Sequence, residues 1–308
     1  MGNLPELKQT KRLIIKYRDC YIMLIPVLAA VIVFRYIPIV SQFFLATSDY
    51  RFIDGILGSP KVGLKHFMHA FSSIDFPVVL KNTVIIATLR LATGFLPPIV
   101  LAIALNDFFH KRFARFSQTI VYLPHFLSWV IVYGIAYAFL SPGFGIINYW
   151  REFFGLADIN MLIDEKYFRG IIIVTGLWKE LGWSCIIYLA ALSGIDPELY
   201  EAANIDGASV WRRILHITLP GIKPVVVFVL TLSMGSLIQS GFEQIFLFQK
   251  TANLRVSDTI ETWVYRRGLV DLEYSFATAV GIFQSVVGLA LVLASNKLAK
   301  RFTGSGIW

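Results

Sequence analysis

The stretch Glu201–Pro220, EAANIDGASVWRRILHITLP, decides the fold of this chain because it is polar and lies between two long apolar runs. Asp196 stands before it as a good N-cap, followed by Pro197 at the first helical position. Glu198 falls in the first turn, where the helix dipole favours an acidic side chain. The pattern predicts a short helix from Pro197 to about Ile205.

A turn is predicted directly after this helix. Asp206 and Gly207 supply it, because glycine adopts a positive φ without steric cost. Residues Ala208 to Ile217 can then form a second helix. Segment 196–220 is therefore predicted to be a helical elbow at a membrane surface.

This elbow resembles the EAA loop of ABC importer permeases, the cytoplasmic coupling helices that seat in a groove of the ATPase subunit. The signature positions that match are Glu201, Ala202, Ala203, Gly207, Ile217, Leu219 and Pro220. The two alanines are small enough for a partner surface to approach closely, and Glu201 offers that surface one fixed charge. An ordinary amphipathic loop helix is the alternative, but the full spacing and the flanking apolar runs favour the coupling loop.

The composition is that of an integral membrane protein. The 308 residues are 56% hydrophobic and 16% charged, with a mean hydropathy of +0.65. Soluble domains are typically about 45–50% apolar and 25% charged. Cys20 and Cys185 fall at the start of one apolar run and inside another, so neither a disulfide framework nor a metal cluster is indicated.

Six apolar segments are long enough to cross a bilayer as helices, which predicts an all-α membrane protein. They are placed at 21–45, 77–105, 117–140, 168–192, 221–247 and 274–295. The first is expected to remain as an uncleaved anchor, because no small-residue cleavage site follows its basic flank. The organisation expected is a cytoplasmic amino-terminal segment 1–20, a permease domain 21–296 that contains the coupling loop 196–220, and a cytoplasmic tail 297–308.

Basic residues predict that both termini are cytoplasmic. The Lys and Arg counts on the two sides differ little, but those of the inner segments cluster close to the ends of the spans, where they set orientation. Lys8, Lys11 and Arg12 before the first span are examples. Membrane topology therefore explains the net charge of +8 better than nucleic acid does, since no basic stripe is interleaved with stacking aromatics.

The first outer loop contains neither a metal site nor a nucleotide site by its sequence. Gly63–Phe67 resembles the Gly-Leu-x-Asn-Phe element of sugar-importer permeases, with His66 in place of the asparagine. His66 and His69 are only two ligands, whereas a metal site needs three or four. Gly58 and Gly63 have the first spacing of a phosphate-binding loop, but the required Lys and Ser/Thr are missing. ATP hydrolysis is thus expected on another chain.

The third span opens with a run, Tyr122–Val130, that resembles a hallmark of the LplB-like branch of carbohydrate-uptake permeases, associated with complex oligosaccharides and polysaccharide fragments. His125, Trp129, Tyr133 and Tyr137 follow at i+4 steps, which predicts one shared helix face. Aromatic faces with polar tips suit a sugar ring, while an aromatic packing face is an equally good interpretation.

The fourth and fifth spans carry the most costly residues. Lys179 and Glu180 lie mid-span, where a charge costs roughly 2.5–3.5 kcal/mol on insertion scales and usually faces a cavity or a partner. Gly176, Glu180 and Trp183 are predicted to share a face. In the fifth span the polar residues predicted to lie largely on one face are Ser233, Ser236, Gln239, Ser240 and Glu243. Packing between helices through small polar residues is the alternative for the serines.

Two further polar side chains lie inside spans. Arg90 in the second span is expected to find a partner within the bundle, and Gln284 in the sixth is a weaker candidate for the transport path.

The resemblance covers almost the whole chain and implies the type I ABC importer permease fold, of the maltose type with a MetI/MalF-like core. It implies a bacterial cytoplasmic-membrane permease subunit that imports oligosaccharides or polysaccharide fragments, without catalytic residues, bound metal or cofactor of its own. ATP and Mg would be held by two partner ATPase subunits. A second, similar permease and an extracytoplasmic solute-binding protein would complete the assembly. The path candidates are His125, Trp129, Tyr133, Gly176, Glu180, Trp183, Ser233, Ser236 and Ser240.

Other functions fit the sequence less well. A permease for another solute class, such as a glycerol phosphate or a simple sugar, could use the same fold. A secondary transporter has no need of the elbow, and no inverted repeat is visible. An intramembrane enzyme would have to rely on His125 and Glu180, which no catalytic signature accompanies.

Overall fold

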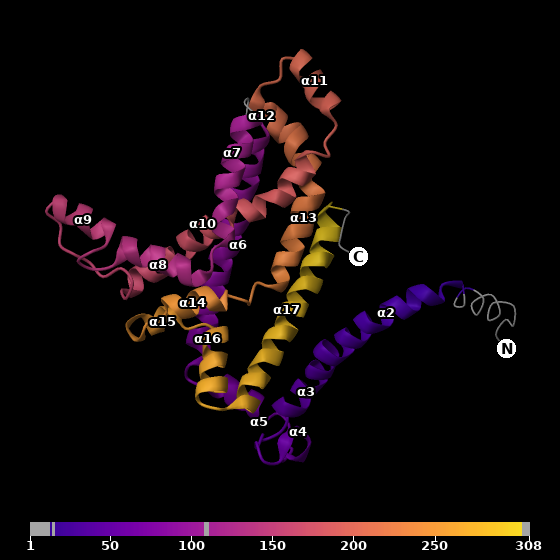
Figure 1. Ribbon diagram of the computed structural model, residues 1–308, viewed down its shortest axis with the longest axis vertical. Helices are drawn as coiled ribbons and strands as arrows, with labels where there is room; N and C mark the ends of the chain where they lie inside the picture. Colours follow the sequence, from indigo (N-terminus) through magenta and orange to yellow (C-terminus); the bar gives the residue numbers. More distant parts are fainter. Residues whose placement is uncertain (1–12, 14–15, 108–110, 304–308) are drawn as a thin grey trace. The chain divides into compact units, whose positions relative to one another are not determined.

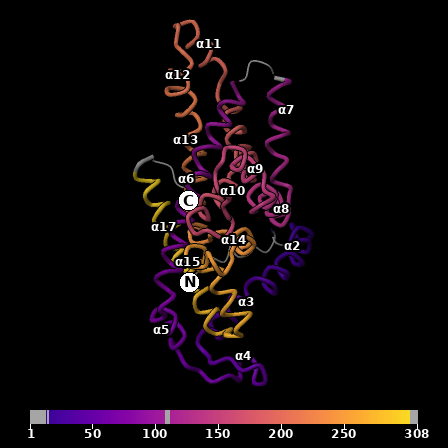
Figure 2. Tube along the Cα trace, turned by 90° about the vertical axis from the view of Figure 1, so that its left-hand side faces the viewer, coloured from indigo at the N-terminus to yellow at the C-terminus, as the bar shows by residue number. Residues whose placement is uncertain are grey.

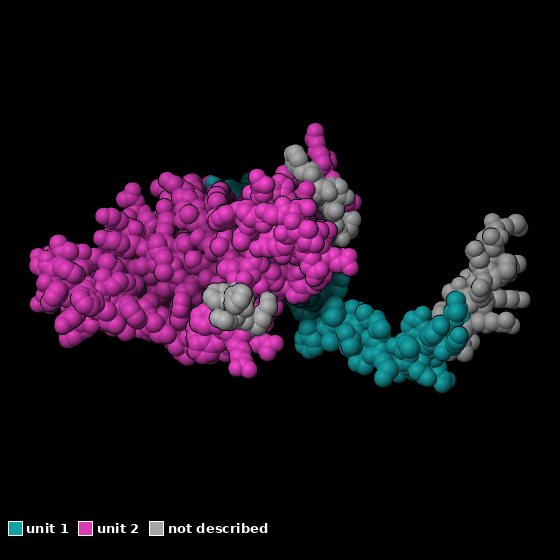
Figure 3. Space-filling view, turned by 90° about the horizontal axis from the view of Figure 1, so that it is seen from above, with its two compact units in different colours: residues 1–71, 267–282 teal, residues 72–266, 283–308 magenta. Residues whose placement is uncertain are grey.

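The computed structural model describes residue 13, residues 16–107 and residues 111–303. Lys8, Lys11, Arg12 and the last part of the tail lie outside these residues. Helices dominate, and the described ranges contain one isolated antiparallel bridge, between Ser48 and Lys61, and no strand. The chain divides into two compact units, Met1–Phe71 with Arg267–Ile282 and Ser72–Arg266 with Phe283–Trp308 (Figure 3).

Four of the six predicted spans are confirmed as single long apolar helices. They are Arg18–Ala46 (α2, η1 and α3), Phe76–Asn106 (α6), Glu165–Leu192 (α10) and Tyr274–Arg301, within α17 (Tyr274–Thr303). A fifth helix of this kind, Val210–Gly235, and a bent pair of shorter helices account for the remaining two predictions.

The prediction of one straight third span was wrong. The helix of α7 (Lys111–Tyr122) and η2 (Leu123–Phe126) meets α8 (Trp129–Leu140) at a bend of 102°. Leu127 and Ser128 are extended, and the Ser128 hydroxyl accepts a hydrogen bond from the amide of Ile131, so a new helix starts there. His125 and Trp129 therefore do not share one helix face.

The fifth span also differs from its prediction, at both ends. Its helix begins at Val210, in α12 (Val210–Arg213), and passes through the π-helical turn η3 (Ile214–Thr218) into α13 (Leu219–Gly235). The second elbow helix therefore does not end at Ile217. The span stops at Gly235 rather than at residue 247, and α14 (Phe242–Phe248) follows a non-helical segment, residues 236–241, which we call the break segment.

Packing of α6, α10 and α13 forms the main core of the larger unit. Ile99 and Ala102 of α6 meet Cys185 and Tyr188 of α10 and Ile222 of α13 in one buried cluster. The close approach of α7 to α10 requires Gly182, because a Cβ there would lie 2.2 Å from the carbonyl oxygen of Val121. Small residues thus set the spacing between these helices.

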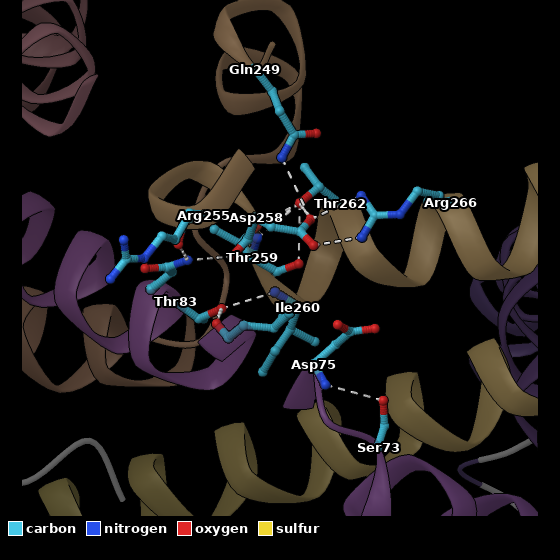
Figure 4. Close-up of polar contacts among 12 residues, drawn as sticks. Ser73, Asp75, Thr83, Gln249, Arg255, Asp258, Thr259, Ile260, Thr262 and Arg266 are labelled. Carbon is cyan, nitrogen blue, oxygen red and sulfur yellow. Dashed lines mark hydrogen bonds and ion pairs between the residues drawn. The ribbon is translucent and has the colours of Figure 1, made fainter. Parts of the chain in front are cut away.

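A buried polar network fixes the short helices that follow α14, namely α15 (Leu254–Ser257) and α16 (Ile260–Tyr265) (Figure 4). The Asp258 carboxylate accepts hydrogen bonds from Thr262 at 2.9 Å and from Arg266 at 2.5 Å. The Asn82 amide of α6 donates to the carbonyl oxygen of Asp258 at 3.0 Å, and Thr83 accepts from the amide of Ile260 at 2.9 Å. These bonds hold α16 against α6.

The smaller unit contains the following elements: α2 (Arg18–Val31), η1 (Ile32–Tyr36), α3 (Ile37–Ala46), α4 (Gly55–Gly58), nearly all of α5 (Lys65–Ser72) and of η5 (Arg266–Val270), and the start of α17. Ala46 and Ala279 are fully buried there, with Phe67 packed against them. Near the core, Asp49 lies 3.4 Å from Lys65 and 3.6 Å from the His66 ring. Burial lowers the pKa of His66, while Asp49 partly offsets that shift. His66 thus contributes to a packed, polar loop between the first two spans.

Candidate functional site

The first helix and the turn of the elbow form as the sequence predicts. Its first helix, α11 (Pro197–Ile205), starts where the Asp196 carboxylate accepts a hydrogen bond from the amide of Glu198 at 3.0 Å. Gly207 follows with φ of +70°, the conformation that glycine adopts without steric cost. Figures 1 and 2 both show α11 at one end of the larger unit, beyond the end of α13.

The elbow presents its signature residues to the outside. Glu201 and Ala202 are exposed, Ala203 is half-buried, and the turn residues Asp206 and Gly207 are exposed. Behind them a groove of about 390 Å³ is lined by Ala203, Ala208, Arg212, Arg213, His216 and Ile217. The exposed Leu219 and Pro220 open α13.

Two side-chain contacts brace the elbow. The hydroxyls of Tyr200 and Thr218 lie 3.0 Å apart and connect α11 to η3. Arg213 donates a hydrogen bond to the side-chain oxygen of Asn204. The elbow is thus one self-supported surface that leads directly into α13.

A cavity of about 420 Å³ lies inside the larger unit, between α6, α8, α10, α13 and the break segment. Five predicted path residues line it, namely Trp129, Gly176, Glu180, Ser233 and Ser236. The other polar residues at its wall are Arg90, Thr93, Ser184 and Gln239. Residues from four spans and from the break segment thus meet around one space.

Four predicted path residues do not line this cavity. His125 and Trp183 stack on each other, with ring centroids 4.3 Å apart and planes 4° apart. Tyr133 packs against Phe248, with ring centroids 5.0 Å apart. Ser240 is fully buried, because the break segment turns it away from the face that an unbroken helix would give it.

The charges of Lys179 and Glu180 largely satisfy each other. One Glu180 oxygen lies 3.4 Å from the Lys179 ammonium and the other lies 2.8 Å from the His125 ring. The buried ammonium also donates to the His125 carbonyl oxygen at 2.5 Å and lies 5.4 Å from the centre of the Trp129 ring. Of the two, Glu180 reaches the cavity, and it does so already paired.

Arg90 supplies the cavity with a cation held by neutral groups. Its guanidinium donates to the carbonyl oxygen of Ser240 at 2.6 Å and to the side-chain oxygen of Gln244. The expectation that Arg90 finds a partner in the bundle is therefore confirmed. Glu261 and Glu180 attract it without a direct ion pair. Arg90 is thus an accessible positive charge at the cavity wall.

Gly241 was not singled out from the sequence, although the position of Arg90 requires a glycine there. Its φ is +82°, and a Cβ there would lie 1.8 Å from the Arg90 guanidinium. A local signal exists, since Ser240–Gly241 is a dipeptide typical of loops. Because the residues on both sides are mostly apolar, the whole run was interpreted as one helix and this loop signal was overlooked.

Known proteins similar to this chain identify its family. Residues 94–304 match the family described as "Binding-protein-dependent transport system inner membrane component". The polygalacturonan/rhamnogalacturonan transport system permease protein YteP of Bacillus subtilis is 43% identical over 98% of this chain and 94% of its own length. Protein LplB of the same organism is 39% identical over 94% of this chain and 90% of its own.

A solved structure agrees over nearly the full length. A chain of the bacterial alginate ABC transporter, crystallised with an alginate pentasaccharide-bound periplasmic protein, matches with a TM-score of 0.89 and 38% identity, covering 96% of this chain and 99% of that one. The family match, the relatives and this fold leave one conclusion: the chain belongs to the binding-protein-dependent transport system inner membrane components, the permeases of ABC importers.

Proposed function

We propose that this permease imports oligosaccharide fragments of polysaccharides, and that it accepts fragments that carry acidic sugars. The observation that carries the proposal is the 420 Å³ cavity, which combines an aromatic ring, hydroxyls and an accessible guanidinium. Its volume falls within the roughly 300–1,000 Å³ typical of small-ligand pockets. Trp129 offers a face for a sugar ring, and Ser233 and Ser236 offer hydroxyls.

The relatives favour this substrate class over other solutes of the same fold. YteP, named for polygalacturonan and rhamnogalacturonan, is 43% identical, and a permease named for arabinooligosaccharides is 31% identical. A permease named for sn-glycerol-3-phosphate is 27% identical. A second solved structure with a TM-score of 0.89 is of a bacterial ABC transporter involved in the import of "the acidic polysaccharide alginate".

Arg90 is our candidate for recognising an acidic sugar. A guanidinium can bind a carboxylate through two parallel hydrogen bonds, and the charge of Arg90 is not consumed by a direct ion pair. Glu180 would repel a sugar carboxylate only weakly, because Lys179 and His125 already pair with it. The cavity can therefore bind a carboxylate beside neutral hydroxyls.

The elbow, in this proposal, couples the permease to two ATPase subunits, which hold ATP and Mg. A second permease completes the path, an extracytoplasmic binding protein delivers the sugar, and both termini lie in the cytoplasm. Approach of the ATPases would draw the coupling helices together and change the side from which the path is open. This is alternating access biased by a partner. The permease itself performs no catalysis.

The experiment that tests the proposal is a transport assay on the complete importer in liposomes, with its binding protein and a panel of acidic and neutral oligosaccharides. We expect ATP-dependent uptake of acidic fragments without any ion gradient. Arg90→Gln should lower the apparent affinity for acidic fragments by roughly tenfold or more relative to neutral ones. Uptake driven by an ion gradient, or an equal loss for acidic and neutral fragments, would contradict it.

A further inference from the structure

A second cavity lies on the other side of the break segment. It has a volume of about 370 Å³ and is lined by residues of α13, the break segment, α16 and α17. Its polar wall consists of Gln239, Glu261, Gln284 and Ser285. Gln284 and Ser285 belong to a membrane span, where polar side chains commonly mark a substrate path.

The break segment is the common wall of the two cavities. Gln239 borders both, and its side chain has no hydrogen-bond partner among the described residues. Ser240 is clamped from both sides. Arg90 of the first cavity donates to its carbonyl oxygen, while its amide and hydroxyl donate to the Glu261 carboxylate of the second, at 3.0 Å and 3.1 Å. The wall therefore has a fixed position, with a carboxamide accessible from either cavity.

The chemistry of the second cavity suits hydroxyl groups. Gln284 uses one N–H to donate to the carbonyl oxygen of Ile238 at 2.9 Å, and its side-chain oxygen and second N–H have no partner in the described parts of the chain. Together with the Gln239 amide this provides both donors and acceptors. The Glu261 carboxylate disfavours an acidic ring there. Between Gly235 and Gly288 the helices α13 and α17 approach closely, since a Cβ on Gly288 would lie 3.0 Å from the Gly235 oxygen, and this crossing borders the cavity.

We propose that the second cavity is a separate subsite for a neutral ring of the same oligosaccharide, with Gln239 facing both subsites and Gln284 binding hydroxyls of that neutral ring. This inference rests on the proposed function. It divides the path into an Arg90 subsite that accepts an acidic ring and a Gln284 subsite that accepts only a neutral one. The importer then prefers fragments long enough to occupy both.

The test varies the length of the sugar. Leu289 lines the second cavity and is 61% exposed, so Leu289→Trp should fill that space, whereas Val286→Trp changes an equally exposed residue of α17 outside both cavities. In the complete importer, Leu289→Trp should leave disaccharide uptake near the wild-type rate and lower tetrasaccharide affinity roughly tenfold, the effect of about 1.4 kcal/mol. Val286→Trp should change neither.

A second variant tests the chemistry rather than the space. Gln284→Met keeps the approximate size of the side chain and removes its hydrogen bonds, so it should weaken tetrasaccharide binding roughly fivefold, the effect of one lost hydrogen bond, and spare disaccharides. The second subsite would be overturned if Leu289→Trp and Gln284→Met weakened disaccharide and tetrasaccharide binding equally. It would also be overturned if the two variants weakened neither. A wild-type importer that takes up no oligosaccharide of either length would instead contradict the proposed function itself.

Discussion

Among the glycines with positive φ, Gly207 and Gly241 lie next to helices of the candidate sites, and their surroundings differ strongly. Gly207, in the elbow, has φ of +70° and no atom within 4 Å of the place where a Cβ would stand. Gly241, at the end of the break segment, has φ of +82°, and the same Cβ would overlap the Arg90 guanidinium. The first turn is held by its own backbone, the second by charged side chains from elsewhere in the chain.

The difference distinguishes an exposed turn, where we propose that the ATPase docks, from a segment braced by contacts with α6 and α16. The elbow turn bonds locally, with the Ala208 amide donating to the Ala203 oxygen at 2.9 Å. The break segment depends on Arg90, 150 residues away, and on Glu261. We therefore expect damage at the break segment to lower stability, and damage at the elbow to lower coupling.

The largest effect is expected for Gly241→Ala. Backbone strain at a non-glycine residue costs about 1–2 kcal/mol, and displacing the charged Arg90 from its two hydrogen-bond acceptors should bring the total loss of stability to roughly 3–5 kcal/mol. Melting of the purified protein in detergent measures it. Gly207→Ala is the matched control, since it carries the strain without the clash. Equal melting temperatures for the two variants would show that the contact between Gly241 and Arg90 does not stabilise the fold.

How far the sequence could predict these regions follows from where their signals lie. Asp196, Pro197 and Gly207 sit inside the elbow, so its helix and turn were predicted correctly. The break segment depends on a contact with Arg90 that no local pattern shows, and the apolar run 221–247 therefore suggested one helix.

The residues that line the first cavity were predictable where a local signal marks them. The cost of a charge in a membrane singled out Glu180, which does line it. Helical periodicity placed Ser240 and His125 wrongly, because each lies at or beyond an interruption of its span.

An intermediate effect is expected for Gly207→Val. A β-branched residue at positive φ should strain the turn by about 1–2 kcal/mol, equivalent to roughly a 5- to 30-fold reduction in productive docking of the ATPase. ATP-driven uptake in liposomes should fall by that factor while the melting temperature stays close to that of Gly207→Ala. A variant that transports normally would show that the turn does not mediate coupling.

The smallest effect should come from Tyr200→Phe in the elbow. It removes the hydrogen bond to Thr218, which joins α11 to η3, and nothing else of the side chain. A single neutral hydrogen bond contributes about 0.5–1.5 kcal/mol. Hydrogen exchange of the α11 amides should become faster by the corresponding factor, with the exchange of α16 as an internal reference. Faster exchange in α16 as well would mean that the elbow does not open independently of the rest of the fold.

The uninterrupted helix from Val210 to Gly235 has a mechanical consequence. Its 26 residues make a rod about 39 Å long, with the elbow at one end and the break segment at the other. A continuous helix transmits a push or a tilt along its length, and regular winding is perturbed at the π-helical turn Ile214–Thr218 and at Pro224 inside α13. A partner that tilts α11 would thus transmit that tilt toward Gly235, the residue after which the break segment begins.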